Sequence, residues 1–165
     1  MTHRALEHLL RIRTLREEDA VRLCGRCRSR LDQCHARERQ VVQALNDFHT
    51  RRLGEEKKLY DNVLGKNLSL KQLEELKARL SIMRQREMNL QRQLDEAQAL
   101  KNQAVTDLLD AKNQRLQALR EKEKIATYAK QSQQRHRRQR DRRAEAELED
   151  VRGPNGVLAV SGGVS

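Results

Sequence analysis

Apolar residues recur at alternating spacings of three and four along two long stretches of the chain. The first stretch, between residues 20 and 62, carries Ala20, Cys24, Cys27, Leu31, Cys34, Val41, Leu45, Phe48 and Leu59. The second carries Leu73, Leu76, Leu80, Met83, Leu90, Leu94, Ala97, Ala104, Leu108, Ala111, Ala118, Ile125 and Ala129. A mean spacing of about 3.5 residues is typical of the buried seam of a coiled coil. The pattern therefore predicts two long helices, each burying one apolar stripe.

A short segment between the two stretches has the signals of a turn. Gly65 can adopt the left-handed conformation that often ends a helix. Ser69 and Gln72 have the spacing of a capping box, and Leu68 and Leu73 have that of a hydrophobic staple around the same helix start. The second helix is therefore expected to begin at this point and to fold back on the first.

These signals together predict an all-α fold, a long antiparallel two-helix coiled-coil hairpin with a disordered C-terminal tail. The hairpin is expected to cover residues 1–150, with arm one at 3–62, the turn at 63–69 and arm two at 70–149. Residues 151–165 are rich in glycine and serine, which is typical of a disordered terminus.

Folding back at the turn also predicts which residues face each other. Cys24 is expected near Leu108, and Leu31 near Lys101. Polar residues interrupt the seam at Arg13, Glu17, Glu38, Arg52, Glu87, Lys101, Arg115 and Lys122. Polar seam residues cost stability but can fix the register of a coiled coil. The apolar pattern stops beyond Ser132, so the second helix is expected to continue there as an exposed or frayed helix.

Composition agrees with an elongated molecule. Charged residues make up 36% of the chain and aromatic residues only 2%, although a compact core normally depends on aromatic and branched aliphatic bulk. The formal net charge of +11 attracts acidic surfaces, whether nucleic acid, anionic lipid or an acidic protein channel.

The arginine-rich segment 135–143 is the most basic part of the chain. It could bind nucleic-acid phosphates, but no aromatic residues are interleaved to stack on bases, as single-strand binders usually require. An acidic protein surface is at least as good a partner for it. A generic coiled-coil scaffold and a basic nucleic-acid-binding adaptor remain alternative functions, although nucleic acid is disfavoured.

The three cysteines do not suggest a metal or redox site. Cys24 and Cys27 have the spacing of half a zinc site, but Cys34 lies two further helical turns away, so one ion cannot reach all three. The pair also lies in mid-helix, away from a helix N-terminus that would activate a thiol. An odd number of cysteines on the seam favours a reduced, intracellular setting.

Other chemical functions find no support in the sequence. No acidic residue is placed with a nucleophile, a histidine base or a glycine-rich phosphate loop, so we expect neither an enzyme nor a cofactor. No apolar run is long enough for membrane insertion, and the first 16 residues do not resemble a secretory signal peptide.

Four short features carry a family resemblance. They are Asp47-Phe48-His49, the pair Glu55-Glu56, Leu59-Tyr60-Asp61, and a leucine-rich second helix after a short turn. In this order they resemble the YscO type of bacterial type III secretion stalk proteins. The segment Leu9 to Arg16 also resembles the start of those proteins, and the likeness covers roughly residues 4 to 130.

The resemblance implies a fold and a function. The fold would be a helical hairpin similar to the flagellar FliJ stalk, located in the cytoplasm and peripheral to the inner-membrane secretion apparatus. Such a stalk links the hexameric secretion ATPase to the cytoplasmic domain of the export gate protein. It stimulates or couples ATPase activity, and it also binds export chaperones.

The resemblance further divides the surface into two candidate sites. A gate-facing surface would comprise residues 47–64 with 72–84, and its candidate residues are Phe48, Arg52, Leu53, Tyr60, Leu64 and Met83. An ATPase-facing surface would comprise residues 4–20 with 111–143, and its candidate residues are Arg11, Arg13, Arg16, Arg115 and Lys122. In the first set, Leu53, Tyr60 and Leu64 form a second apolar stripe beside the seam. An exposed apolar stripe of this kind often marks a partner site.

Overall fold

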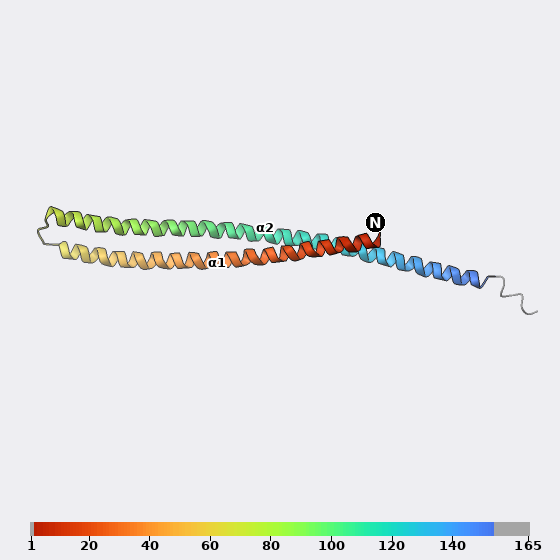
Figure 1. The fold of residues 1–165 in the computed structure, drawn as a ribbon. Helices are drawn as coiled ribbons and strands as arrows, with labels where there is room; N and C mark the ends of the chain where they lie inside the picture. Colours follow the sequence, from red (N-terminus) through yellow and green to blue (C-terminus); the bar gives the residue numbers. More distant parts are fainter. Residues whose placement is uncertain (1, 154–165) are drawn as a thin grey trace, which may run out of the picture. The chain divides into compact units, whose positions relative to one another are not determined.

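The computed structural model describes residues 2–153. It contains two α-helices, α1 (His3–Val63) and α2 (Leu70–Val151), and no strand within the described residues (Figure 1). The predicted all-α helical hairpin is confirmed. The predicted disordered tail falls mainly on residues 154–165, which lie outside the described residues.

The turn between the helices is built as the sequence indicates. Gly65 adopts a φ of +79°, and the N–H of Lys66 donates to the carbonyl of Val63 over 3.2 Å. At the start of α2, the N–H of Gln72 donates to Ser69 Oγ over 3.3 Å, and the N–H of Ser69 donates to Gln72 Oε1 over 3.0 Å. This reciprocal capping box satisfies backbone donors that a helix start leaves free, and it fixes where α2 begins.

The chain packs as two compact units, and residues 20–114 form the larger one. Here the two helices flanking the turn run antiparallel, side by side (Figure 1). Cys24, Leu108 and Ala111 form a buried cluster against which Leu23, Cys27 and Leu31 pack. Ala97 and Ala104 are also buried on α2, so small side chains occupy much of its seam and let the helices approach closely.

The second unit comprises the described residues 2–19 and 115–153. Its buried apolar residue is Leu6, and Ile125 and Ala129 are half-buried on α2. Ser132 is the last half-buried residue of α2, and the side chains from 133 to 151 are exposed. The burial on α2 therefore ends where the apolar pattern ends.

Long side chains pair about one heptad beyond the residues that the predicted register places opposite them. Lys101 pairs with Glu38, one heptad further toward the turn than Leu31, beside which it was expected. A helical side chain leans toward the N-terminus of its own helix. In antiparallel helices the two side chains therefore lean in opposite directions. Two long side chains meet when their residue numbers are higher than those of residues whose backbones lie directly opposite each other. The side chain of Cys24 is short, so its end is displaced less along the helix axis. Cys24 lies in one cluster with Leu108, as predicted.

Neither helix contains a segment both long and apolar enough to cross a membrane, as judged over residues 2–153.

Candidate interaction surfaces

Most of the polar seam residues lie in ion pairs between α1 and α2. Each pair joins one cation to one carboxylate on the opposite helix, and all of these side chains are half-buried or nearly so. The pairs are Glu38 with Lys101 at 2.9 Å, Arg52 with Glu87 at 2.7 Å, Glu17 with Lys122 at 3.3 Å, and Arg13 with Glu121. Charge complementarity therefore continues the seam where apolar contact is interrupted.

Arg52 lies at the centre of a small network near the turn. Its Nη1 donates to Glu56 Oε1 over 2.7 Å, and its Nε lies 2.7 Å from Glu87 Oε2. The other oxygen of Glu87 lies 2.7 Å from Nδ1 of His49. Arg52 is thus engaged within the chain, and its guanidinium holds the two helices together.

The remaining gate-facing candidates divide into two groups. Phe48 and Met83 are half-buried in the seam. By contrast, Leu53, Tyr60 and Leu64 are exposed, and Leu64 keeps 74% of its surface accessible. The second apolar stripe read from the sequence is therefore a solvent-facing surface on α1 and the first turn residue.

Two further exposed apolar residues, Leu68 and Leu70, lie at the turn and at the first residue of α2. Leu70 is 75% exposed, and Leu68 is also exposed just before the capping box. The sequence analysis assigned Leu68 to a hydrophobic staple and did not consider Leu70 as a contact residue. Leu70 precedes Leu73, the first seam residue of α2, and this off-seam position is the sequence signal that could have identified Leu70 as an exposed contact residue.

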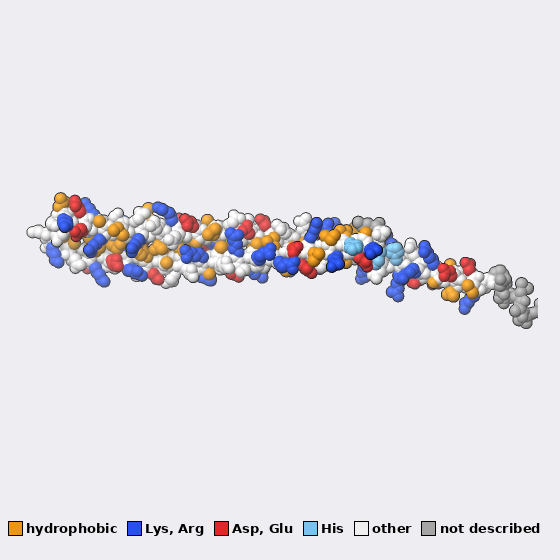
Figure 2. All heavy atoms as spheres, in the orientation of Figure 1, with side chains coloured by type: hydrophobic (Ala, Val, Ile, Leu, Met, Phe, Trp, Pro, Cys, Tyr) orange, Lys and Arg blue, Asp and Glu red, His pale blue; other side chains and the backbone are white. Residues whose placement is uncertain are grey.

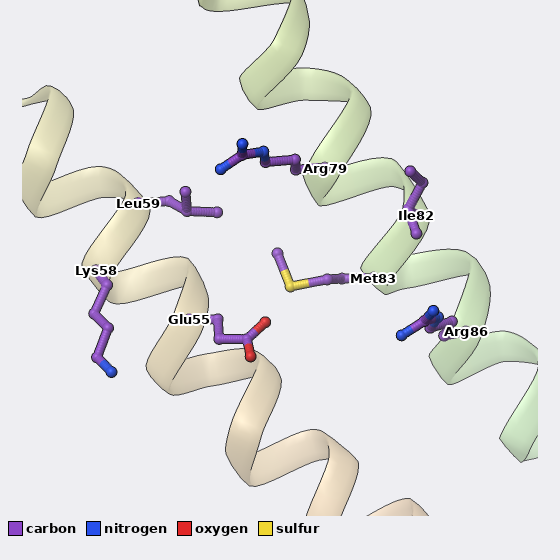
Figure 3. Close-up of a pocket in the computed structure, with 7 residues that line it drawn as sticks. All are labelled: Glu55, Lys58, Leu59, Arg79, Ile82, Met83 and Arg86. Carbon is purple, nitrogen blue, oxygen red and sulfur yellow. The ribbon is translucent and has the colours of Figure 1, made fainter.

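A groove lies between α1 and α2 a few turns from the turn, with a volume of about 410 Å³ (Figure 3). Leu59 and Met83 point toward each other's helices and form its apolar floor, and Ile82 on α2 also lines it. Four charged residues line it as well, namely Glu55, Lys58, Arg79 and Arg86. Only Met83 of these lining residues was a candidate in the sequence analysis.

The ATPase-facing candidates also divide. Arg13 and Lys122 are ion-paired to Glu121 and Glu17 and are half-buried. Arg11, Arg16 and Arg115 are exposed and present their guanidinium groups to solvent. The exposed group is the one that can meet an acidic partner without breaking an internal ion pair.

The exposed end of α2 carries two blocks of opposite charge. His3 on α1 lies near His136, with ring centroids 6.1 Å apart, and six arginines follow or flank that position between residues 135 and 143. Acidic and apolar side chains occupy the last turns of the helix (Figure 2).

The described residues contain no group of three or more side chains placed to hold a metal ion. Cys24 is buried, and Cys27 and Cys34 are half-buried free thiols on the seam. The three cysteines therefore serve as small side chains that pack along the seam.

Comparison with known proteins finds relatives among the components of type III secretion. A family model described as type III secretion protein YscO matches residues 6–153. The Yop proteins translocation protein O of Yersinia pseudotuberculosis serotype I (strain IP32953) is 30% identical over 84 residues, which cover 51% of this chain and 54% of that protein. The matched region thus spans about half the length of that relative.

A solved structure matches over a larger share. The crystal structure of type III secretion protein YscO from Vibrio parahaemolyticus is similar with a TM-score of 0.85 and 26% sequence identity, covering 90% of this chain and 93% of that one. The similarity in structure therefore includes most of both helices.

Proposed function

The chain belongs to the YscO family of type III secretion proteins, and on this premise we propose that it is the non-enzymatic stalk linking the hexameric secretion ATPase to the export gate. In this role it stimulates or couples ATPase activity from the cytoplasm, at the periphery of the inner-membrane apparatus. It also binds export chaperones, and it needs neither a cofactor nor insertion into the membrane. The observation that carries the proposal is that ion pairs join α1 to α2 within each of the two units.

The contact with the ATPase is proposed to be electrostatic. Arg11, Arg16 and Arg115 are exposed near the N-terminal part of α1 and on α2, where they can face acidic side chains of a partner. Exposed charges interact with weak directionality and are screened by salt within about 10 Å at 0.1 M. Such contacts tolerate rotation or sliding of one partner against the other.

The contact with the export gate is proposed to be apolar. Leu53 and Tyr60 on α1, Leu64 in the turn and Leu70 at the start of α2 are large exposed side chains. Exposed apolar side chains that lie close together often form partner sites, and this is the basis of the proposed contact.

ATPase stimulation by the purified chain tests the proposal directly. Reversing charge with Arg11→Glu and Arg16→Glu is expected to weaken stimulation of the cognate ATPase, with the largest loss at low salt. Arg28→Glu with Arg92→Glu changes the net charge equally at exposed positions elsewhere and is expected to leave stimulation intact. Equal stimulation by both double variants would contradict the proposed ATPase contact.

A pull-down with the cytoplasmic domain of the export gate tests the other contact. Tyr60→Ala with Leu64→Ala is expected to abolish capture without loss of helicity, because both side chains are exposed. Leu100→Ala with Leu109→Ala removes a similar exposed apolar area away from the turn and serves as the matched control. Normal capture of the Tyr60 and Leu64 variant would exclude this site.

A further inference from the structure

Two unpartnered surfaces of this chain have complementary chemistry. We propose that the end of α2, residues 144–151, docks into the groove between α1 and α2 of a second copy of the chain. The groove is the one floored by Leu59 and Met83 (Figure 3). This contact goes beyond the stalk function and does not depend on it.

The groove offers an apolar floor with a basic rim. Leu59 and Met83 point into it from opposite helices, and Ile82, which also lines it, is 57% exposed. Of its charged lining residues, Lys58, Arg79 and Arg86 are cations and Glu55 is the single anion. A ligand that fits this groove is an acidic helix with a short apolar face.

The end of α2 is such a helix. Ala144, Leu148 and Val151 follow one another at spacings of four and three, which places them on one face of α2. Leu148 is 65% exposed and Val151 is 84% exposed, so the face has no cover within the described chain. Anchors at this spacing are typical of helices that bind in a groove. Glu145 and Glu147 flank this face, whereas Glu149 and Asp150 lie toward the opposite side of the helix.

Charge favours this pairing at physiological salt. The end of α2 brings the two flanking carboxylates, Glu145 and Glu147, toward a rim with three cations and one carboxylate. The arginines at 135–140 lie about 10 Å or more from Glu147 along the helix axis, where 0.15 M salt screens their repulsion, so only Arg142, Arg143 and the following Arg152 oppose the pairing. The nearest charges therefore dominate the contact.

The size and symmetry of the contact define what should be observed. Three apolar side chains bury far less than the roughly 1,200 Å² of a stable protein interface, so association is expected to be reversible and concentration-dependent. The donor and acceptor surfaces differ, so the contact is heterologous, and a third copy can add to either end of a pair.

Sedimentation of the full-length chain at 0.15 M salt tests the proposal with two variants. Arg79→Glu with Arg86→Glu reverses the rim of the groove, and Leu148→Asp with Val151→Asp removes the apolar face of the α2 end. The wild type is expected to exceed its monomer mass of 19.3 kDa as concentration rises, whereas each variant alone stays monomeric. An equimolar mixture of the two variants keeps one intact groove and one intact α2 end, so it is expected to form pairs that stop at twice the monomer mass.

Matched controls separate this contact from general charge or apolar effects. Arg28→Glu with Arg92→Glu, and Leu100→Asp with Leu109→Asp, alter exposed residues elsewhere and are expected to associate like the wild type. Circular dichroism verifies that every variant keeps its helices. A wild type that stays monomeric at all concentrations, variants that still associate alone, or a mixture that stays monomeric would each overturn the proposal. The first of these results would leave the groove to an acidic helix of another protein.

Discussion

Lys101 on α2 and Glu38 on α1 meet across the helix interface, with Nζ and Oε1 2.9 Å apart and both side chains largely shielded from solvent. The two residues stand at seam positions, where a coiled coil normally places apolar side chains. A single polar residue there would be left without a partner in the wrong register. The pair therefore contributes to specificity, because it is satisfied in one alignment of the two helices.

Reversing one charge of this pair should destabilise the chain. Lys101→Glu places two carboxylates side by side at the seam, and we expect a loss of about 1–2 kcal/mol in the free energy of unfolding. The double variant Glu38→Lys with Lys101→Glu restores opposite charges and should recover most of that loss. Urea unfolding followed by circular dichroism measures both. If the double variant were no more stable than the single one, the pair would not contribute to pairing in this register.

Two glycines predict opposite effects of the same substitution. Gly65 has a φ of +79° at the end of α1, and an added Cβ would meet no atom within 4 Å. Gly65→Ala should therefore cost about 1 kcal/mol through backbone strain alone. Gly54 lies inside α1 with equally open space around it, so Gly54→Ala should stabilise by up to about 1 kcal/mol through helix propensity. Thermal unfolding should move in opposite directions for the two variants, and a shift of the same sign would contradict this explanation.

Ala111 limits how closely the helices can approach. It is only 2% exposed and packs in the cluster with Cys24 and Leu108. Ala111→Leu inserts bulk into this contact and should cost about 1–3 kcal/mol. Ala99→Leu adds the same bulk at an exposed position of α2 and should change stability little. Equal unfolding midpoints for the two variants would show that the seam near Ala111 has spare room.

Much of the fold is predictable from the sequence because its signals are local. The capping box at Ser69 and Gln72 depends on residues three apart, and the seam positions follow from a spacing that repeats within each helix. Burial on α2 also ends at Ser132, where that spacing stops.

The candidate sites were less predictable because they depend on contacts between the helices. Whether Arg13 and Lys122 stay available to a partner depends on the register, and the structure pairs both with carboxylates of the opposite helix. The groove near Met83 was not predicted either. The groove exists because Leu59 and Met83 fill the space between α1 and α2 only in part. The spacing of apolar residues along one helix does not predict how well side chains of two helices fill the space between them.

The network around Arg52 allows a stronger test of how polar groups stabilise the seam. Arg52 touches Glu56 and Glu87, and all three side chains are mostly shielded from solvent. Arg52→Met keeps much of the side-chain volume but leaves two carboxylates without their shared cation, and we expect a loss of about 2–3 kcal/mol.

Removing a carboxylate together with its cation should be far less costly. Arg52→Met with Glu87→Leu replaces the pair across the helices by apolar contact, and similar replacements of buried ion pairs are often neutral or stabilising. We therefore expect the double variant to recover more than half of the stability lost by Arg52→Met in urea unfolding. His49→Ala removes only the exposed partner of Glu87 and should cost less than about 1 kcal/mol. If the double variant were as unstable as Arg52→Met, the unpaired charge of Glu87 would not be the cause of the destabilisation. The loss would then come from the missing packing around the aliphatic part of the Arg52 side chain.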